Sequence, residues 1–154
     1  MGIDAYTAND VIVATDYNGD WILSDFADGT VAELSAPNEL SAITTGYNGN
    51  SLGSHNEPGR QRDLTIRLVK GSGDDKRLNA SYNLWKNRDR SFKPLSMSFT
   101  KNIAHSDGSI TNDKVSCYFG LPTGQPSQVT DTAGNTEQVV SIYTIRFGNS
   151  ERSM

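Results

Sequence analysis

Serine, histidine and glutamate, three side chains that serve in catalysis, occur close together at Ser54, His55 and Glu57. A hydrolase uses such groups as nucleophile, base and orienting carboxylate. Adjacent side chains on an extended chain point to opposite sides, so Ser54 cannot bond to the His55 ring as a nucleophile bonds to its base. The one G-x-S-x-G sequence, residues 49–53 (GNSLG), does not lie at a predicted strand-to-helix turn, the context in which this motif exposes a nucleophilic serine. We expect no catalytic residues.

Metal and cofactor sites are equally weakly indicated. His55 with Glu57, and His105 with Asp107, could each share a strand face, but a zinc site needs three or four ligands at recognised spacings. Cys117 is the only cysteine, which excludes an internal disulfide and any multi-cysteine site. The glycine-rich residues 46–53 lack the lysine and hydroxyl residue of a phosphate-binding loop. We expect no metal and no cofactor, and a buried Cys117.

Charge is distributed unevenly along the chain. Residues 1–59 contain nine acidic residues and no lysine or arginine, whereas residues 60–101 contain eleven basic residues and four acidic ones. One interpretation is that the two segments neutralise each other within a monomer. The other is that an acidic face of one subunit meets a basic face of the next and orients assembly. The sequence leaves both open.

Aromatic residues within the basic segment could indicate a nucleic-acid surface. However, Leu78, Tyr82 and Trp85 recur at the i, i+4, i+7 spacing of an amphipathic helix, which favours packing over base recognition. Ser72 followed by Asp75 resembles a capping arrangement. Together these patterns predict a helix at about residues 74–87.

The elements on either side of this helix read as strands. Asn18-Gly19 and Asp28-Gly29 are strong hairpin turn signals, with positive φ expected at both Asn18 and Gly19. Alternation predicts two strands, each with an apolar set on one face. These sets are Leu64, Ile66 and Leu68 in one strand, and Leu95, Met97 and Phe99 in the other.

Two further strands complete the pattern. Val115, Cys117 and Phe119 recur at every second position, the period of a strand, and predict one of them. Residues 137–148 carry apolar residues on both faces, so we expect this strand to be covered on both sides, and the preceding turn should pair it with the segment around Val129. The whole predicts a mainly β fold, a two-sheet β-sandwich or barrel with one flanking α-helix.

Length and composition indicate one domain, residues 1–154, with a long polar loop at about 44–62. Hydrophobic residues make up only 35% of the chain, which predicts a thin core that benefits from partner subunits. No apolar run approaches the ~20 residues of a membrane span, and the N-terminus lacks the pattern of a secretory signal. We therefore expect no membrane insertion and a cytoplasmic protein.

Several stretches resemble a known family. They are residues 26–30 (FADGT), and residues 59–79 (GRQRDLTIRLVKGSGDDKRLN), in which a strand leads through Gly-Ser-Gly to a capped helix. In these motifs and in the order of elements over about residues 10–147, the chain resembles the tail tube proteins of contractile bacteriophage tails. Related tubes occur in bacteriocin-like particles and type VI secretion systems.

The resemblance implies a structural virion protein without enzymatic activity. Subunits of such proteins form hexameric rings that stack into a tube, and double-stranded DNA leaves the capsid through its lumen. The implied partners are a tail sheath, a tape measure, a baseplate and a tail terminator protein, besides non-specifically passing DNA. The implied location is the tail, assembled in the cytoplasm of a bacterial host.

In a stacked assembly, the polar loop at 44–62 can reach the next ring and acquire contacts there. Loops longer than about twelve residues are uncommon in compact domains unless they are functional. The residues expected at the subunit or ring interface are Tyr47, Asn48, Asn50, Ser54, His55, Asn56, Glu57, Arg60 and Arg62. The alternative function is a carbohydrate- or receptor-binding β-sandwich module of a phage or bacterial surface structure, which would need exposed aromatic residues on a concave face.

Overall fold

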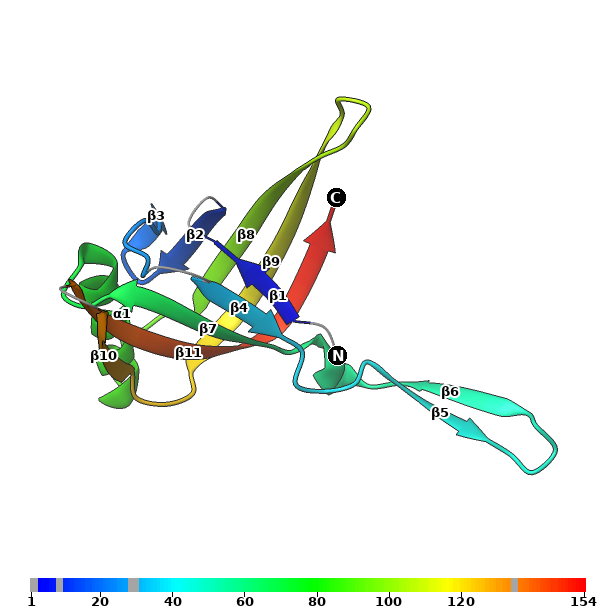
Figure 1. Ribbon diagram of the computed structural model, residues 1–154. Coiled ribbons are helices and arrows are strands. Elements are labelled where there is room, and N and C mark those ends of the chain that lie inside the picture. Colours follow the sequence, from blue (N-terminus) through cyan, green and yellow to red (C-terminus); the bar gives the residue numbers. More distant parts are fainter. Residues whose placement is uncertain (1–2, 8–9, 28–30, 134–135) are drawn as a thin grey trace.

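Antiparallel strands dominate the computed structural model, which describes residues 3–7, 10–27, 31–133 and 136–154 (Figure 1). Nine strands form one sheet: β1 (Ile3–Tyr6), β2 (Val11–Asp16), β3 (Gly19–Ile22), β4 (Ala32–Ser35), β7 (Arg62–Val69), β8 (Leu95–Ala104), β9 (Ile110–Pro122), β10 (Ser127–Ala133) and β11 (Thr136–Ser153). Two more, β5 (Ser41–Thr45) and β6 (Ser51–His55), pair only with each other. A 3-10 helix, η1 (Glu57–Arg60), and the helix α1 (Gly73–Lys86) complete the described elements.

The large sheet curls over itself. Its strand order is β1-β4-β7-β11-β9-β8-β2-β3, with β10 paired to β11. The long strand β11 pairs with β7 through residues 140–147 and with β9 through residues 145–153, so it passes from one layer into the other. Tyr6 on β1 and Phe99 on β8 are distant in strand order, yet their ring centroids lie 4.9 Å apart. The predicted mainly β fold with one helix is confirmed. Its two layers are halves of one sheet, which does not close into a barrel.

The core lies between these halves. Leu64, Ile66 and Leu68 on β7 are all buried, as their alternation predicts. Leu95, Met97 and Phe99 on β8 face them from the opposite layer and are buried as well. Cys117 is buried, as expected.

Helix α1 begins at the predicted place but packs differently from the expectation. The Ser72 hydroxyl accepts a hydrogen bond from the Asp75 N–H at 3.3 Å, which confirms the cap. Of the predicted inward stripe only Leu78 is fully buried, whereas Tyr82 is half-buried and Trp85 is 43% exposed. The Trp85 ring packs on Phe92 instead, with centroids 5.1 Å apart.

Polar contacts fix the helix to the sheet. The buried Asp74 carboxylate accepts hydrogen bonds from the Trp21 indole at 3.2 Å and from the backbone N–H groups of Ser24 and Asp25 at 2.7 and 2.9 Å. Arg77 donates two hydrogen bonds of 3.1 Å to the carboxylate of Asp16. Its guanidinium also lies 4.0 Å from the centroid of the Trp21 ring, a cation–π arrangement.

A second buried carboxylate anchors the start of the helix. The Tyr143 hydroxyl donates to the Asp75 carboxylate, and the Ser141 hydroxyl donates to the same carboxylate at 3.2 Å. Burial, assisted by the hydrogen bond to Asp75, raises the pKa of Tyr143 well above its ordinary value. Helix α1 is therefore held by charge-assisted hydrogen bonds more than by an apolar stripe.

Glycine closes the described hairpin turns. Gly19, Gly49 and Gly108 have φ of +96°, +85° and +88°. Asn18 is not among the described non-glycine residues with positive φ, so the expectation of positive φ there is wrong, and Gly19 alone takes that conformation. The predicted turn at Asp28-Gly29 lies outside the described residues.

Strands β10 and β11 differ in part from expectation. Residue Val129 pairs with Val140, which confirms the predicted hairpin of β10 with β11. On β11, Val140 is buried and Ile142 is half-buried, whereas Thr144 and Arg146 on the same face are exposed. The expected cover on both faces is therefore confirmed only for the first part of the strand that is described.

The alternation of buried residues on β9 is interrupted at Phe119. Val115 and Cys117 are buried as predicted, but Phe119 is 59% exposed. The register between β8 and β9 shifts between Leu95 and Met97, and Phe119 has a φ of +58°. This bulge turns the Phe119 ring outward, so the prediction that Phe119 continues the period-two alternation of Val115 and Cys117 is wrong.

Candidate functional site

A two-stranded arm, formed by β5 and β6, projects from the body of the protein (Figure 1). Every residue of both strands is exposed. Residues 44–62, expected as a polar loop, contain the last two residues of β5, the tip of this arm, β6, η1 and the first residue of β7. Two-stranded hairpins are marginally stable on their own in water. We therefore expect contact with a partner to stabilise the arm.

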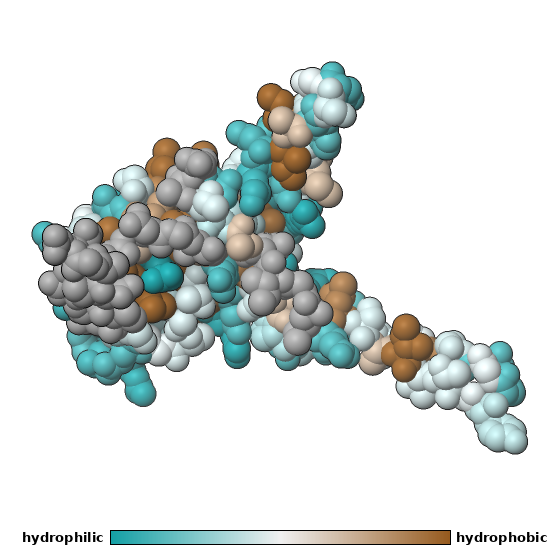
Figure 2. Space-filling view, in the orientation of Figure 1, coloured by the Kyte–Doolittle hydropathy of each residue, from teal (hydrophilic) through white to brown (hydrophobic). Residues whose placement is uncertain are grey.

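Both faces of the arm carry an unpartnered aliphatic side chain. Ile43 lies opposite Gly53, and Leu52 lies opposite Thr44. Cross-strand partners share a face and successive residues alternate, so Ile43 and Leu52 project from opposite faces. They are 74% and 77% exposed. Figure 2 shows hydrophobic atoms on the arm beyond the body.

The base of the arm is tightly fixed. Asn56 donates its backbone N–H to the Leu40 carbonyl at 2.7 Å and its side-chain amide to the Glu39 carbonyl at 2.6 Å. A Cβ on Gly59 would lie 2.4 Å from the Leu40 Cα, so only glycine permits this crossing of the two chain segments. The arm thus leaves the body in a defined direction.

The nine residues expected at an interface are spread along the arm and its base. Tyr47, Asn48 and Asn50 lie at the exposed tip. Others lie on β6, around η1 and at the start of β7: Ser54, His55, Asn56, Glu57, Arg60 and Arg62. They form an extended strip and not one compact patch. The nine expected residues do not include the aliphatic Ile43 and Leu52, although isolated apolar residues in a polar segment of the sequence can indicate an interface.

The residues considered for chemistry are used in local contacts. The Ser54 hydroxyl donates to the Ala42 carbonyl at 3.4 Å, and His55 Nε2 lies 3.4 Å from a Glu57 carboxylate oxygen. His105 Nε2 lies 2.7 Å from the Thr111 hydroxyl. Within the described part of the chain, no three His, Cys, Asp or Glu residues are placed to hold a metal ion. No described helix is long and apolar enough to cross a membrane.

A shallow apolar groove lies beside the base of the arm. Its lining includes Phe119, Leu121, Pro122 and Gly148, with Gln61 next to η1. Arg146 also lines the groove and donates to the Asp63 carboxylate at 2.7 and 3.1 Å. The hydrogen bond to Asp63 raises the pKa of Arg146, and the Asp63 carboxylate neutralises the guanidinium charge locally.

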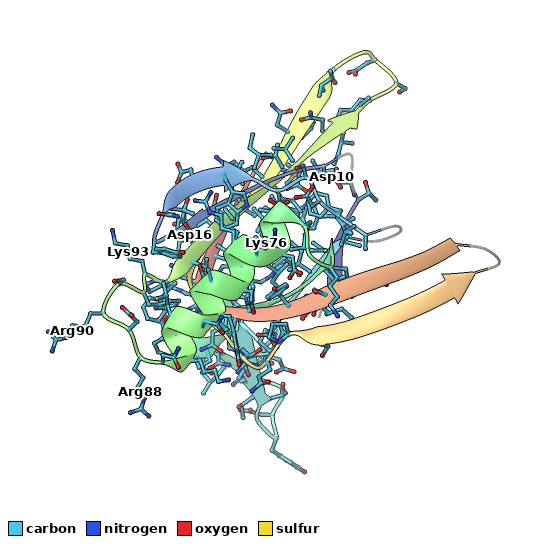
Figure 3. The ribbon with its side chains drawn as sticks, turned by 90° about the vertical axis from the view of Figure 1, so that its left-hand side faces the viewer. Asp10, Asp16, Lys76, Arg88, Arg90 and Lys93 are labelled. Atoms are coloured by element: carbon cyan, nitrogen blue, oxygen red, sulfur yellow. The ribbon has the colours of Figure 1, made fainter. Side chains whose placement is uncertain are left out.

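A basic surface follows helix α1. Arg88, Arg90 and Lys93 extend away from the body, as Figure 3 shows. Arg88 and Arg90 line a depression with Trp85 and Phe92. We call Arg88, Arg90 and Lys93 the basic loop. Together with the exposed ring of Trp85, these cationic groups form a surface suited to an acidic partner.

Part of the uneven charge is neutralised within the chain. Asp16 pairs with Arg77 at 3.1 Å, and Asp10 lies 3.9 Å from Lys101. Each of these pairs joins the acidic N-terminal segment to the basic middle segment. The basic loop projects beyond these contacts (Figure 3). Both interpretations of the charge pattern thus retain support.

The comparisons with known proteins concern the fold. No protein-family model matches the chain, and no curated protein matches its sequence. Among solved structures, it is similar to a chain in the cryo-EM structure of the anti-feeding prophage (AFP) baseplate, 6-fold symmetrised. The TM-score is 0.59 at 9% sequence identity, and the match covers 99% of this chain and 97% of that chain. The protein therefore shares its fold with a chain of the anti-feeding prophage baseplate.

Proposed function

We propose that the protein is a structural subunit of a phage-tail-like contractile particle. The observation that carries the proposal is the shared fold, which spans nearly the whole of both chains and comes from an assembly described as having 6-fold symmetry. The chain itself presents the surfaces that such an assembly needs. These are an arm that is exposed on both faces and two terminal strands, β1 and β3, at the edges of the curled sheet.

The finer proposal is a tail tube subunit. Six copies would form a ring by joining the free edges of their sheets, since edge pairing removes unpaired backbone groups that otherwise invite aggregation. Rings would then stack through the arms. The lumen would conduct double-stranded DNA, and the sheath, tape measure, baseplate and tail terminator proteins would be partners. In this proposal the protein has no catalytic activity.

DNA conduction places a condition on charge. Each phosphate neutralised by a lysine or arginine adds salt-sensitive affinity, which would retard sliding. We propose an acidic or mixed inner wall, with the basic loop turned toward neighbouring subunits or the sheath. A uniformly basic inner wall in an assembled tube would contradict this.

Trp85 favours a second candidate. It is partly exposed and packs on Phe92 beside a depression of the surface, as expected of a carbohydrate- or receptor-binding module. Saturable glycan binding by the monomer, lost in Trp85→Ala, would support this candidate. A glycan screen without binding would remove it.

Electron microscopy of the concentrated protein tests the leading proposal. The native chain should form rings and stacked tubes in negative stain. A variant with residues 42–54 replaced by Asn-Gly keeps the Ser41–His55 pair and closes it with a two-residue turn. It should form single rings or monomers but no long tubes.

Thermal unfolding supplies the control for this variant. Since every strand residue of the arm is exposed, its removal should leave the Tm of the body nearly unchanged. A folded variant that still builds tubes of native length would refute the role of the arm. A native chain that stays monomeric at millimolar concentration would refute the proposed function.

A further inference from the structure

Phe119 has a backbone conformation that a large aromatic residue rarely adopts. Among the described non-glycine residues only Arg88 and Phe119 have positive φ, at +54° and +58°. Arg88 follows the end of a helix, where a left-handed residue commonly closes the last turn. Phe119 lies inside a strand, where such a conformation is strained. Strain of this kind occurs often at functional sites, which makes the exposed ring a candidate for binding.

The bulge places the ring over a bare stretch of backbone. A Cβ on Gly148 would lie 3.5 Å from Phe119 Cδ1, so the ring lies against a strand residue that has no side chain. With Leu121, Pro122 and Thr123, the ring lines a groove of about 280 Å³. The groove has room for a branched aliphatic side chain.

The groove is also electrically neutral. Its one cationic lining residue, Arg146, is held by Asp63 through two hydrogen bonds. The arm matches this property, because residues 40–54 contain no charged side chain. An uncharged apolar ligand is therefore favoured over an acidic or basic one.

We propose that this groove binds the arm of a second copy of the protein, with Leu52 entering against Phe119. Ala42 and Thr44 project from the same face of β5, because they are two residues apart. Leu52 shares this face, because it is the cross-strand partner of Thr44. The arm does not serve its own groove, since Leu52 is 77% exposed and the arm extends away from the body (Figure 1).

The contact joins two different surfaces, so it is heterologous and can propagate from copy to copy. The opposite face of the arm, with Ile43, is left for a further contact. The inference rests on the proposed function only in requiring that copies assemble. It adds which surface receives the arm.

The variant Phe119→Gly separates binding from folding. Glycine adopts a φ of +58° without strain, so the Tm of the isolated chain should stay the same or rise. Removing the aromatic wall should weaken self-association by roughly tenfold or more in sedimentation experiments. Leu52→Ser should weaken it similarly. The double variant should show little further loss, because both changes remove one contact.

Cysteine cross-linking tests the location directly. Leu52→Cys protein mixed with Thr123→Cys protein should give a disulfide-linked pair of the two different chains. Ile110→Cys is the matched control, because Ile110 is also a strongly exposed aliphatic residue on a strand, and its mixture with Thr123→Cys should not give this product. The native Cys117 is buried and should not compete.

These outcomes separate the inference from the proposed function. Specific Leu52–Thr123 cross-links in a protein that forms no rings or tubes would retain the groove and contradict the tube. Tubes that form normally with Phe119→Gly and without the cross-link would retain the tube and overturn the groove.

Discussion

Gly120 on β9 lies opposite the buried Phe147 of β11. A Cβ at this position would lie 2.6 Å from the Phe147 ring and 2.8 Å from the Leu95 carbonyl oxygen. Phe147 is fully buried, so it has little space in which to move away. The strained bulge at Phe119 immediately precedes this contact. Close packing of backbone against a ring and exposure of the neighbouring ring are thus two results of one local geometry.

Gly120→Ala should therefore lower the free energy of unfolding by about 2 kcal/mol or more through overpacking. Gly124→Ala is the matched control, because no atom lies within 4 Å of a Cβ built there. Urea unfolding of both variants measures the difference. Equal stabilities would show that the sheet can shift to admit a methyl group.

Tyr143 should make the fold sensitive to alkaline pH. Its pKa is raised in the folded protein by burial and by Asp75, whereas in the unfolded chain it titrates near pH 10. Above about pH 10, the unfolded chain releases this proton while the folded chain retains it. The stabilising contribution is therefore complete below pH 10 and declines above it by up to about 1.4 kcal/mol per pH unit.

Urea unfolding of the wild type and Tyr143→Phe between pH 8 and pH 11 tests this assignment. The variant should be less stable by about 1–3 kcal/mol at pH 8, because the buried Asp75 carboxylate loses a donor. Its stability should decline less than that of the wild type from pH 10 to pH 11. Parallel curves would assign the alkaline loss to other groups.

At the scale of elements, helix α1 is placed by buried carboxylates at its first turn. Asp74 receives three hydrogen bonds from residues of another segment, and Asp75 receives the hydroxyls of β11. Their position at the helix N-terminus is also favoured by the helix dipole. The helix can thus carry an exposed C-terminal end, with Trp85 and the basic loop, without losing its attachment.

Asp74→Ala should loosen this attachment. It leaves the N–H groups of Ser24 and Asp25 without the acceptor they have in the native chain, which should cost about 2–4 kcal/mol of stability. Glu33→Ala removes an exposed carboxylate from β4 and should change stability by less than about 0.5 kcal/mol. Hydrogen exchange should show faster opening of α1 in the first variant only. Uniform protection in both would refute the anchoring role.

At the scale of the whole molecule, the projecting basic loop is suited to orient association. If the loop of one copy meets an acidic face of the next, attraction should accelerate assembly at low salt. Arg88→Glu combined with Arg90→Glu should then slow assembly by about tenfold or more and reduce its salt dependence. Light scattering measures both quantities.

Lys76→Glu combined with Lys114→Glu gives the matched change of charge on exposed residues outside the loop. This control should alter the assembly rate much less. Equal slowing by both pairs would show that only net charge matters, and that the uneven charge is neutralised without directing assembly.

The sequence by itself determined the features that depend on near neighbours along the chain. Alternation placed Leu64, Ile66 and Leu68 inward, and capping residues placed the start of α1, because strand period and helix caps are local properties of the backbone. It also located the segment at 44–62, which contributes most of the arm. It did not indicate that residues 51–55 pair as a hairpin with residues 41–45.

Only the tertiary structure decided the register and the surfaces. The bulge that exposes Phe119 depends on pairing with β8 and β11, and the exposure of Trp85 depends on carboxylates that hold α1 by its other end. The curl that brings Tyr6 to Phe99 joins strands far apart in the sequence. Such contacts arise from packing between distant segments, and no short window of residues contains both partners.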